Sequence, residues 1–140
     1  QPHEHIFIVE FLLEHCFKSA FLPNPPEFYN NIEISHSSLF RAYLTHKEKN
    51  KLEFSSSSPS LSFKLNTFFG DLELLEITFR RRRINHADYK SWHFGNVMKV
   101  LQYCHERGYL DQTQMEELEV SYNNHNVNEK LDIHIDNSKK

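Results

Sequence analysis

The run Arg80-Arg81-Arg82-Arg83 is the part of this sequence whose residue types and spacing have the clearest chemical meaning. It gathers four of the chain's six arginines at one place, whereas the lysines are scattered. Guanidinium groups stay charged at neutral pH and recognise carboxylates and phosphates. The run therefore predicts a binding site for a negatively charged group: an acidic protein surface, a nucleic-acid backbone or a phosphate.

The residues that follow the run extend the predicted site. We expect a helix to begin near His86, where free backbone N–H groups and the positive end of the helix dipole favour anions. Asp88 counts against a bound phosphate because it already occupies that helix start. The predicted partner- or anion-binding residues are Arg80, Arg81, Arg82, Arg83, His86 and Lys90.

The position of the run relative to a sheet follows from strand geometry. Alternation along an extended segment points Arg81 and Arg83 one way and Arg80 and Arg82 the other. One of these faces would push unpaired guanidinium groups into the core, so we expect the strand to leave the sheet at about Arg80. The alternative to a binding site is a solvated rim, in which the arginines pair with acids on neighbouring segments, namely Asp71, Glu73 and Glu76.

Composition narrows the class of function. A chain of 140 residues with a net charge of -3 has no overall field that would recruit nucleic acid or a membrane, so any polyanion site must be local. Three glycines are too few to favour glycine-rich phosphate loops.

The sequence favours a non-enzymatic interaction or regulatory domain that docks a protein partner through the arginines. The alternative is a nucleic-acid-binding domain that uses Arg80–Arg83 and Lys90, with Trp92, His93 and Arg107 as candidates to extend the patch.

A third hypothesis, a metal-dependent nuclease, rests on two carboxylates. Asp71 and the segment Glu76-Ile77-Thr78 loosely resemble the PD-(D/E)xK nuclease pattern. The resemblance implies that Asp71 and Glu76 would hold a magnesium ion for phosphodiester cleavage. The lysine of that pattern is Thr78 here, and no proline precedes Asp71.

Other chemistry is not expected. The histidines include the adjacent couples His15-Cys16 and Cys104-His105, but neighbouring helical residues point about 100° apart and seldom reach one ion. The sequence contains no closely spaced cysteine pair and no Gly-x-Ser-x-Gly motif. We therefore expect no catalytic residue, no metal and no cofactor.

Cysteine usage and hydropathy predict a compartment. Cys16 and Cys104 fall in hydrophobic helical patterns and are expected to be reduced thiols; a disulfide between them would require the two helices to touch. Residues 6–13, the most apolar stretch, are too short and too charged to span a membrane and lack the features of a signal peptide. We expect an intracellular protein, cytoplasmic or nuclear, and the start at Gln1 suggests an excised domain.

The elements that must position the arginines form a predicted α+β domain over residues 1–140. We expect a small antiparallel sheet from about residues 51–80, with residues 130–135 as a candidate edge strand, packed against an N-terminal helix and a C-terminal αα-hairpin. A polar serine-rich loop at 55–60 is expected to join strands at 52–54 and 61–65, and a third strand to cover 72–79. The last five residues are expected to be a disordered tail.

Helical spacing predicts four helices. The first covers residues 4–21, before the prolines at 23–26, and the second covers 39–49, after a short strand at 32–34 and a serine cap. The third is expected to begin at an Asn85 cap and to end at Gly108. Asp111 and Gln114 form a capping-box pattern for the fourth helix, which should pair with the third.

Overall fold

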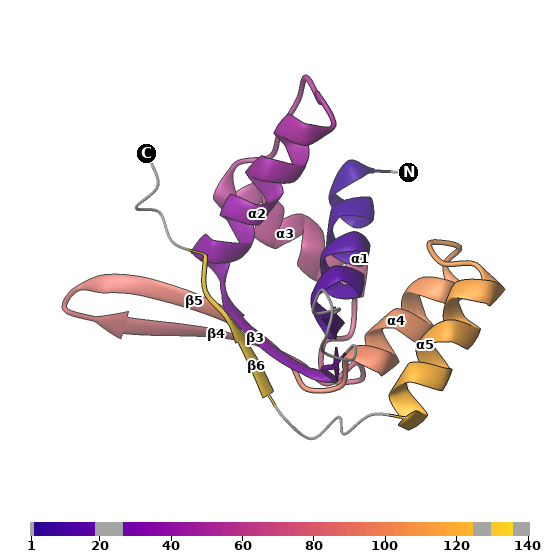
Figure 1. Cartoon of the computed structure of the whole chain (residues 1–140). Coiled ribbons are helices and arrows are strands. Elements are labelled where there is room, and N and C mark those ends of the chain that lie inside the picture. Colours follow the sequence, from indigo (N-terminus) through magenta and orange to yellow (C-terminus); the bar gives the residue numbers. More distant parts are fainter. Residues whose placement is uncertain (1, 19–26, 125–129, 136–140) are drawn as a thin grey trace.

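The arrangement of helices and strands is seen in a computed structural model that describes residues 2–18, 27–124 and 130–135. α1, α2 and α3 cover one side of a four-stranded sheet, α4 and α5 form a helical hairpin, and β4–β5 project away from the body (Figure 1). None of the described helices is long and apolar enough to cross a membrane. The elements are α1 (His3–Cys16), β1 (Phe17–Lys18), β2 (Glu27–Phe28), β3 (Asn31–Ser35), α2 (His36–Lys49), α3 (Ser58–Phe69), β4 (Ile77–Ile84), β5 (Ala87–Phe94), α4 (Val97–Glu106), α5 (Gln112–Asn124) and β6 (Lys130–Ile133).

The sheet that carries the arginines has the strand order β4-β5-β3-β6. β5 pairs antiparallel with both β4 and β3, whereas β6 runs parallel to β3. The predicted α+β class is confirmed, and β6 is the edge strand expected near the end of the chain. The sheet is mixed rather than purely antiparallel because β6 enters beside β3 in the same direction.

The strands expected in the middle of the chain are wrong. Residues 52–54 form no strand, and α3 occupies the place of the strand expected at 61–65. Strand alternation would put Phe63 on one face with Leu61 and Leu65, yet Phe63 is 72% exposed while both leucines are buried. The buried residues of α3 recur instead at helical spacing: Leu61, Leu65, Phe68 and Phe69.

The serine-rich stretch, expected to be a polar loop, begins a helix. The Ser57 hydroxyl accepts a hydrogen bond from the backbone N–H of Ser60 at 3.3 Å. Pro59 lies in the first turn, where its missing N–H costs nothing. Serine and proline are residues of both loops and helix starts, and here the helix start prevails because apolar residues follow at helical spacing.

The third predicted helix is wrong in its first half. Residues 87–94 form β5, and α4 begins only at Val97. The cap of α4 is Asn96, whose side-chain oxygen accepts a hydrogen bond from the Lys99 N–H at 3.1 Å. Asparagine is favoured both at helix starts and in left-handed turns, so the residue type of Asn85 did not discriminate between the two.

Several predicted helix boundaries are confirmed. Ser35 caps α2 by accepting a hydrogen bond from the Ser38 N–H at 3.1 Å. Gly108 follows α4 with a φ of 89°, and Asp111 and Gln114 exchange the reciprocal hydrogen bonds of a capping box at the start of α5. α4 and α5 therefore form the expected αα-hairpin. α1 covers most of the first predicted helix, and the prolines at 23–26 lie outside the described residues.

Cys104 is buried in α4 as a free thiol. Burial raises its pKa to about 12, which suppresses the reactive thiolate. The side chain of Cys16 lies outside the described residues, as does the predicted tail at 136–140.

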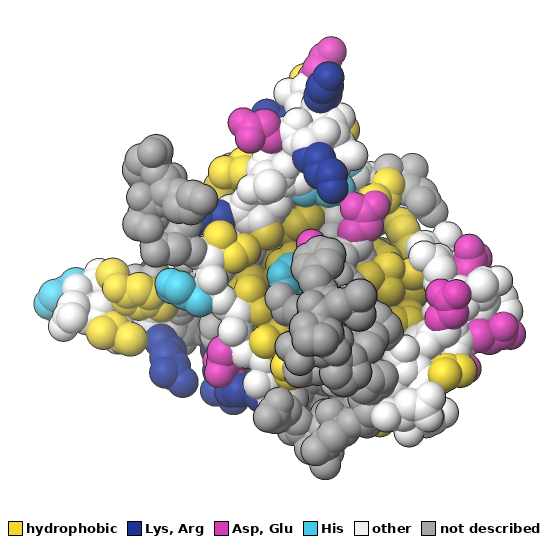
Figure 2. Space-filling view, viewed as in Figure 1, with side chains coloured by type: hydrophobic (Ala, Val, Ile, Leu, Met, Phe, Trp, Pro, Cys, Tyr) yellow, Lys and Arg dark blue, Asp and Glu magenta, His cyan; other side chains and the backbone are white. Residues whose placement is uncertain are grey.

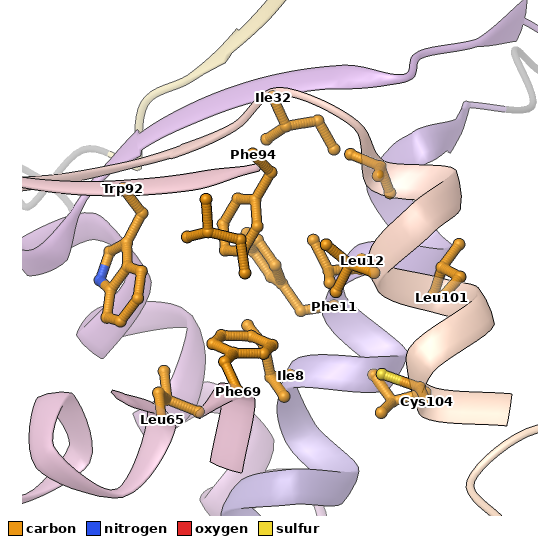
Figure 3. Close-up of a cluster of buried hydrophobic side chains, with 14 of the residues drawn as sticks. Ile8, Phe11, Leu12, Ile32, Leu65, Phe69, Trp92, Phe94, Leu101 and Cys104 are labelled. Atoms are coloured by element: carbon orange, nitrogen blue, oxygen red, sulfur yellow. The ribbon is translucent and has the colours of Figure 1, made fainter. Parts of the chain in front are cut away.

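Trp92, the chain's only tryptophan, is fully buried where the sheet meets the helices (Figure 3). Its ring packs against Phe79 of the neighbouring strand, with the ring centroids 4.2 Å apart. The indole N–H donates a hydrogen bond to Nδ1 of His36 at 3.1 Å, and Nε2 of His36 donates to the Ser58 carbonyl at 2.9 Å. These bonds tie β5 to the starts of α2 and α3, and they require the neutral His36 tautomer with its proton on Nε2.

His36 makes the fold sensitive to acid. Burial lowers its pKa, the charge of Lys90 lowers it slightly further, and the hydrogen bond to Ser58 opposes both. The unfolded chain binds a proton at this residue below about pH 6.5, whereas folded His36 stays neutral, so the free energy of unfolding falls as the pH drops through that value. Burial also lowers the pKa values of His5 and His46, which adds to the same acid sensitivity.

We expect His36→Asn to lower the free energy of unfolding at pH 7.5 by about 1–3 kcal/mol, because the Ser58 carbonyl loses its donor. The variant should also lose less stability than the parent between pH 7.5 and 5.5, since asparagine does not titrate. Urea unfolding at several pH values, followed by Trp92 fluorescence, measures both quantities. Equal pH slopes for parent and variant would contradict the role assigned to His36.

Candidate anion-binding hairpin

The arginine run lies in β4, which begins at Ile77 rather than at residue 72 because residues 72–76 form turns. β4 pairs with β5 along its whole length, from Ile77 opposite Phe94 to Ile84 opposite Ala87. Asn85 and His86 connect the two strands at φ values of 51° and 67°. Positive φ at both central residues is typical of a type I′ turn, whose twist matches that of the flanking strands.

Beyond the body of the protein this hairpin is a two-stranded ribbon (Figure 1). β3 pairs with β5 no further than Ser91, so residues 81–90 have no third strand among the described residues, and residues 80–89 are all exposed. The strand leaves the covered part of the sheet at about Arg80, as predicted, because Ser91 opposite Arg80 is the last residue of β5 that pairs with β3; β4 itself continues to Ile84 instead of ending at residue 79. The physical reason for that expectation still holds, since the strand continues outside the covered part of the sheet and no guanidinium enters the core.

The strand register distributes the basic side chains over both faces of the ribbon. Successive residues of a strand point to opposite faces, and residues directly opposite one another share a face. The predicted alternation of the arginines follows from this pairing. One face holds Arg81 and Arg83 beside Lys90 and Asp88, and the other holds Arg80 and Arg82 beside Ser91 and Tyr89.

The hairpin is a local basic region in an acidic protein. Residues 77–94 contain five Lys or Arg and one acid, Asp88, for a net charge of +4, so the rest of the chain carries -7. Acidic side chains gather at the α4–α5 end of the molecule, away from the hairpin (Figure 2). Arg81 lies directly opposite Lys90, and a like-charge pair of this kind costs stability.

Two of the acids expected to neutralise the arginines bind other groups. Asp71 accepts a hydrogen bond from the Leu74 N–H at 3.1 Å, and Glu76 forms an ion pair with Lys99 at 3.1 Å. Across residues 2–18, 27–124 and 130–135, no ion pair includes any of the four arginines. The guanidinium groups of the hairpin are therefore exposed to solvent and form no ion pair within the described part of the chain.

Glu33, on β3, is the acid whose charge interacts with Arg80. It accepts a hydrogen bond from Lys130 at 2.8 Å. That bond holds the pKa of Glu33 below its usual range, with smaller contributions from His93 and Arg80. Because Lys130 already pairs with this carboxylate, Glu33 leaves most of the positive charge of the hairpin unopposed.

The two carboxylates of the nuclease hypothesis lie at a turn. Glu76 has a φ of 56° and precedes β4, and the segment that should lead from a strand into a helix forms the β4–β5 hairpin instead. Within the described residues, no group of three His, Cys, Asp or Glu side chains could hold a metal ion.

The residues proposed to extend the patch have separate environments. Trp92 belongs to the core, and His93 hydrogen-bonds Asn31 at 2.6 Å. Arg107 follows α4 and lies over the rings of Phe68 and Tyr103. The six residues of the predicted site, namely Arg80–Arg83, His86 and Lys90, all lie on the hairpin. The side chains suggested to extend the site make the other contacts just described.

Two exposed apolar side chains of the hairpin were missed by sequence reasoning. Ile84 is 47% exposed and Tyr89 is 56% exposed, on the same face as Arg80 and Arg82. The signal that would have revealed the hairpin is Asn85-His86 between two strand-like runs; it is weak because glycine usually follows the asparagine of such a turn.

A buried polar network was also missed. The Ser56 hydroxyl donates a hydrogen bond to the Glu4 carboxylate at 2.6 Å, and Lys64 donates to both at 3.0 and 3.1 Å. Burial raises the pKa of Glu4, but the hydrogen bonds from Ser56, from the backbone and from Lys64, together with the charge of His3, outweigh it and lower the pKa. Glu4 and Ser56 are buried, and the network joins α1 to α3 and the loop before it.

We expect His86→Gly to raise the free energy of unfolding by about 1 kcal/mol, because glycine adopts the left-handed conformation without the steric cost that histidine pays. Hydrogen exchange of the hairpin amides and urea unfolding measure the effect. Asn85→Ala serves as the control and should be destabilising, because alanine tolerates positive φ less well than asparagine. A less stable His86→Gly variant would contradict the assigned turn.

Comparisons with known proteins add no assignment. No family model matches the chain, and neither a curated protein nor a solved structure matches it. Function is therefore inferred from the geometry and charge of the hairpin.

Proposed function

We propose that this protein is a nucleic-acid-binding domain whose β4–β5 hairpin contacts the phosphate backbone through Arg80–Arg83 and Lys90. The observation that carries the proposal is the projecting hairpin of net charge +4, whose arginines are exposed and form no ion pair among the described residues. Phosphate contacts by lysine and arginine supply most of the affinity in non-specific nucleic-acid binding.

The repulsion between neighbouring cations of the hairpin supports the proposal that an anionic ligand binds there. Arg81 opposite Lys90 is unfavourable in the free protein, and an anion between them would remove the repulsion. β4 is also an edge strand, and charged side chains on an edge prevent aggregation. One or two charges suffice for that purpose, whereas four consecutive arginines provide charge on both faces.

Nucleic acid explains this charge better than a protein partner does. Arginine is enriched in protein interfaces too, but interfaces with DNA are much more positively charged, as this hairpin is. A protein partner remains the second candidate, and a specific observation favours it: Tyr89 and Ile84 are exposed beside the free edge of β4, where an acidic strand would add to the sheet.

The separation of charge favours binding in one orientation. Glu116, Glu117 and Glu119 lie on α5, which is far from the hairpin tip (Figure 1). A polyanion is repelled by that end and attracted by the ribbon, so the field of the protein presents the hairpin first. An acidic total charge is thus compatible with a local nucleic-acid site.

The proposal predicts salt-dependent binding that is lost in a hairpin variant. With four or five phosphate contacts, log K against log salt should have a slope of about -4. Replacing Arg81, Arg82 and Arg83 with glutamine should weaken binding roughly 100-fold and reduce the slope by about 2.7. Fluorescence anisotropy of labelled mixed-sequence DNA and RNA between 50 and 200 mM salt measures both effects.

A matched control removes three charges elsewhere. Lys47, Lys49 and Lys51 lie at and just beyond the end of α2, and their replacement by glutamine changes the net charge by the same amount. That variant should retain nearly all binding. No binding by the parent, or equal losses in both variants, would overturn the proposal. If the hairpin variant aggregates but still binds, the arginines protect the sheet edge instead.

A further inference from the structure

We infer that the ligand of the hairpin is double-helical B-form DNA and that the ribbon enters the major groove, with its two faces directed at the two phosphate backbones. This inference rests on the proposed function. It adds the form of the nucleic acid and the mode of contact, which follow from the shape of the ribbon and the placement of its charges.

The first reason is that positive charge occupies both faces. Arg81, Arg83 and Lys90 share one face with Asp88, for a net charge of +2, and Arg80 and Arg82 share the other, also with a net charge of +2. A single strand lying across the ribbon can reach the charges of one face only. A groove presents a phosphate backbone on each side, so all five cations face phosphate at once.

The second reason is size. Residues 81–84 and 87–90 form four cross-strand pairs and close with a two-residue turn. At strand rise, the ribbon is about 14 Å long before the turn, and one sheet layer with its side chains is about 10 Å thick from face to face. The major groove of B-DNA is about 12 Å wide and admits a two-stranded ribbon, whereas the minor groove is about 6 Å wide.

The third reason excludes other nucleic acids. The major groove of A-form RNA is too narrow to admit side chains for reading. Proteins that bind single strands use several exposed aromatic residues as stacking platforms. Along residues 77–94, the only strongly exposed aromatic side chain is Tyr89; Trp92 and Phe94 are buried. The ribbon therefore has the charge for a duplex but not the stacking surface for a single strand.

The turn supplies groups suited to the floor of the groove. Asn85 and His86 are at the tip, so they are the first residues to approach the bases when the ribbon enters. Asparagine can pair with adenine through two hydrogen bonds, and histidine offers a donor or an acceptor. The backbone contacts along the ribbon would position this tip.

The test compares four ligands of one sequence at 100 mM salt: duplex DNA, each of its single strands, and duplex RNA. We expect duplex DNA to bind at least tenfold more tightly than the others. Netropsin, which occupies the minor groove, should not displace the protein. Two paired variants then separate the faces: Arg80→Gln with Arg82→Gln, and Arg81→Gln with Arg83→Gln. Each should reduce the slope of log K against log salt by about 1.8.

The outcomes distinguish the two levels of inference. If no nucleic acid binds, the proposed function fails. If single strands or duplex RNA bind as tightly as duplex DNA, if netropsin competes, or if only one pair of arginines affects the slope, groove insertion is wrong while nucleic-acid binding stands. Circular dichroism and Trp92 fluorescence of each variant show that the fold is retained, so that a loss of binding reports on contacts.

Discussion

The hydrogen bond between the Trp92 indole and His36 is the interaction on which the hairpin and the helices jointly depend. Trp92 lies on β5 at the base of the ribbon, and His36 begins α2 and reaches the start of α3 through the Ser58 carbonyl. Burying these polar groups is favourable only because each has a partner. The neutral imidazole thus links the base of the ribbon to α2 and α3, in addition to the pairing of β5 with β3.

Beyond that base, the ribbon is held together by the pairing of its own two strands and by its turn. The ladder between β4 and β5 pairs the backbone groups that the two strands turn toward each other, and the turn at Asn85 and His86 sets the register. Among the described residues nothing packs over the tip, so the side chains there contribute little burial. Packing therefore places little constraint on the residue types at these positions, so that charged residues are tolerated there. The repulsion between Arg81 and Lys90 still lowers the stability of the fold. The core determines where the ribbon lies, and the exposed strands carry its charged side chains.

The sequence predicted the location of the charged site but not its shape. Residue type alone located Arg80–Arg83 and their alternation, because strand geometry has a period of two. Helix starts with strong chemistry, such as the Asp111 and Gln114 box, were also predictable. The hairpin was missed since His86 occupies a position where glycine is usual, and since the apolar spacing around Phe94 fits a helix as well as a strand. The helix α3 was missed because Phe63, which is exposed, completes an alternating pattern by chance. In each case, contacts between residues distant in the sequence determine whether the segment is a helix or a strand.

We propose that the exposed ribbon, and not another surface, meets the nucleic acid. The most direct measurement is an NMR titration of the ¹⁵N-labelled protein with a short B-form duplex, following the backbone amides. The account predicts that shifts concentrate at residues 80–91 and reach the indole N–H of Trp92 weakly, while the amides of α5 stay unchanged. Shifts centred on any other element, with residues 80–91 unaffected, would contradict it.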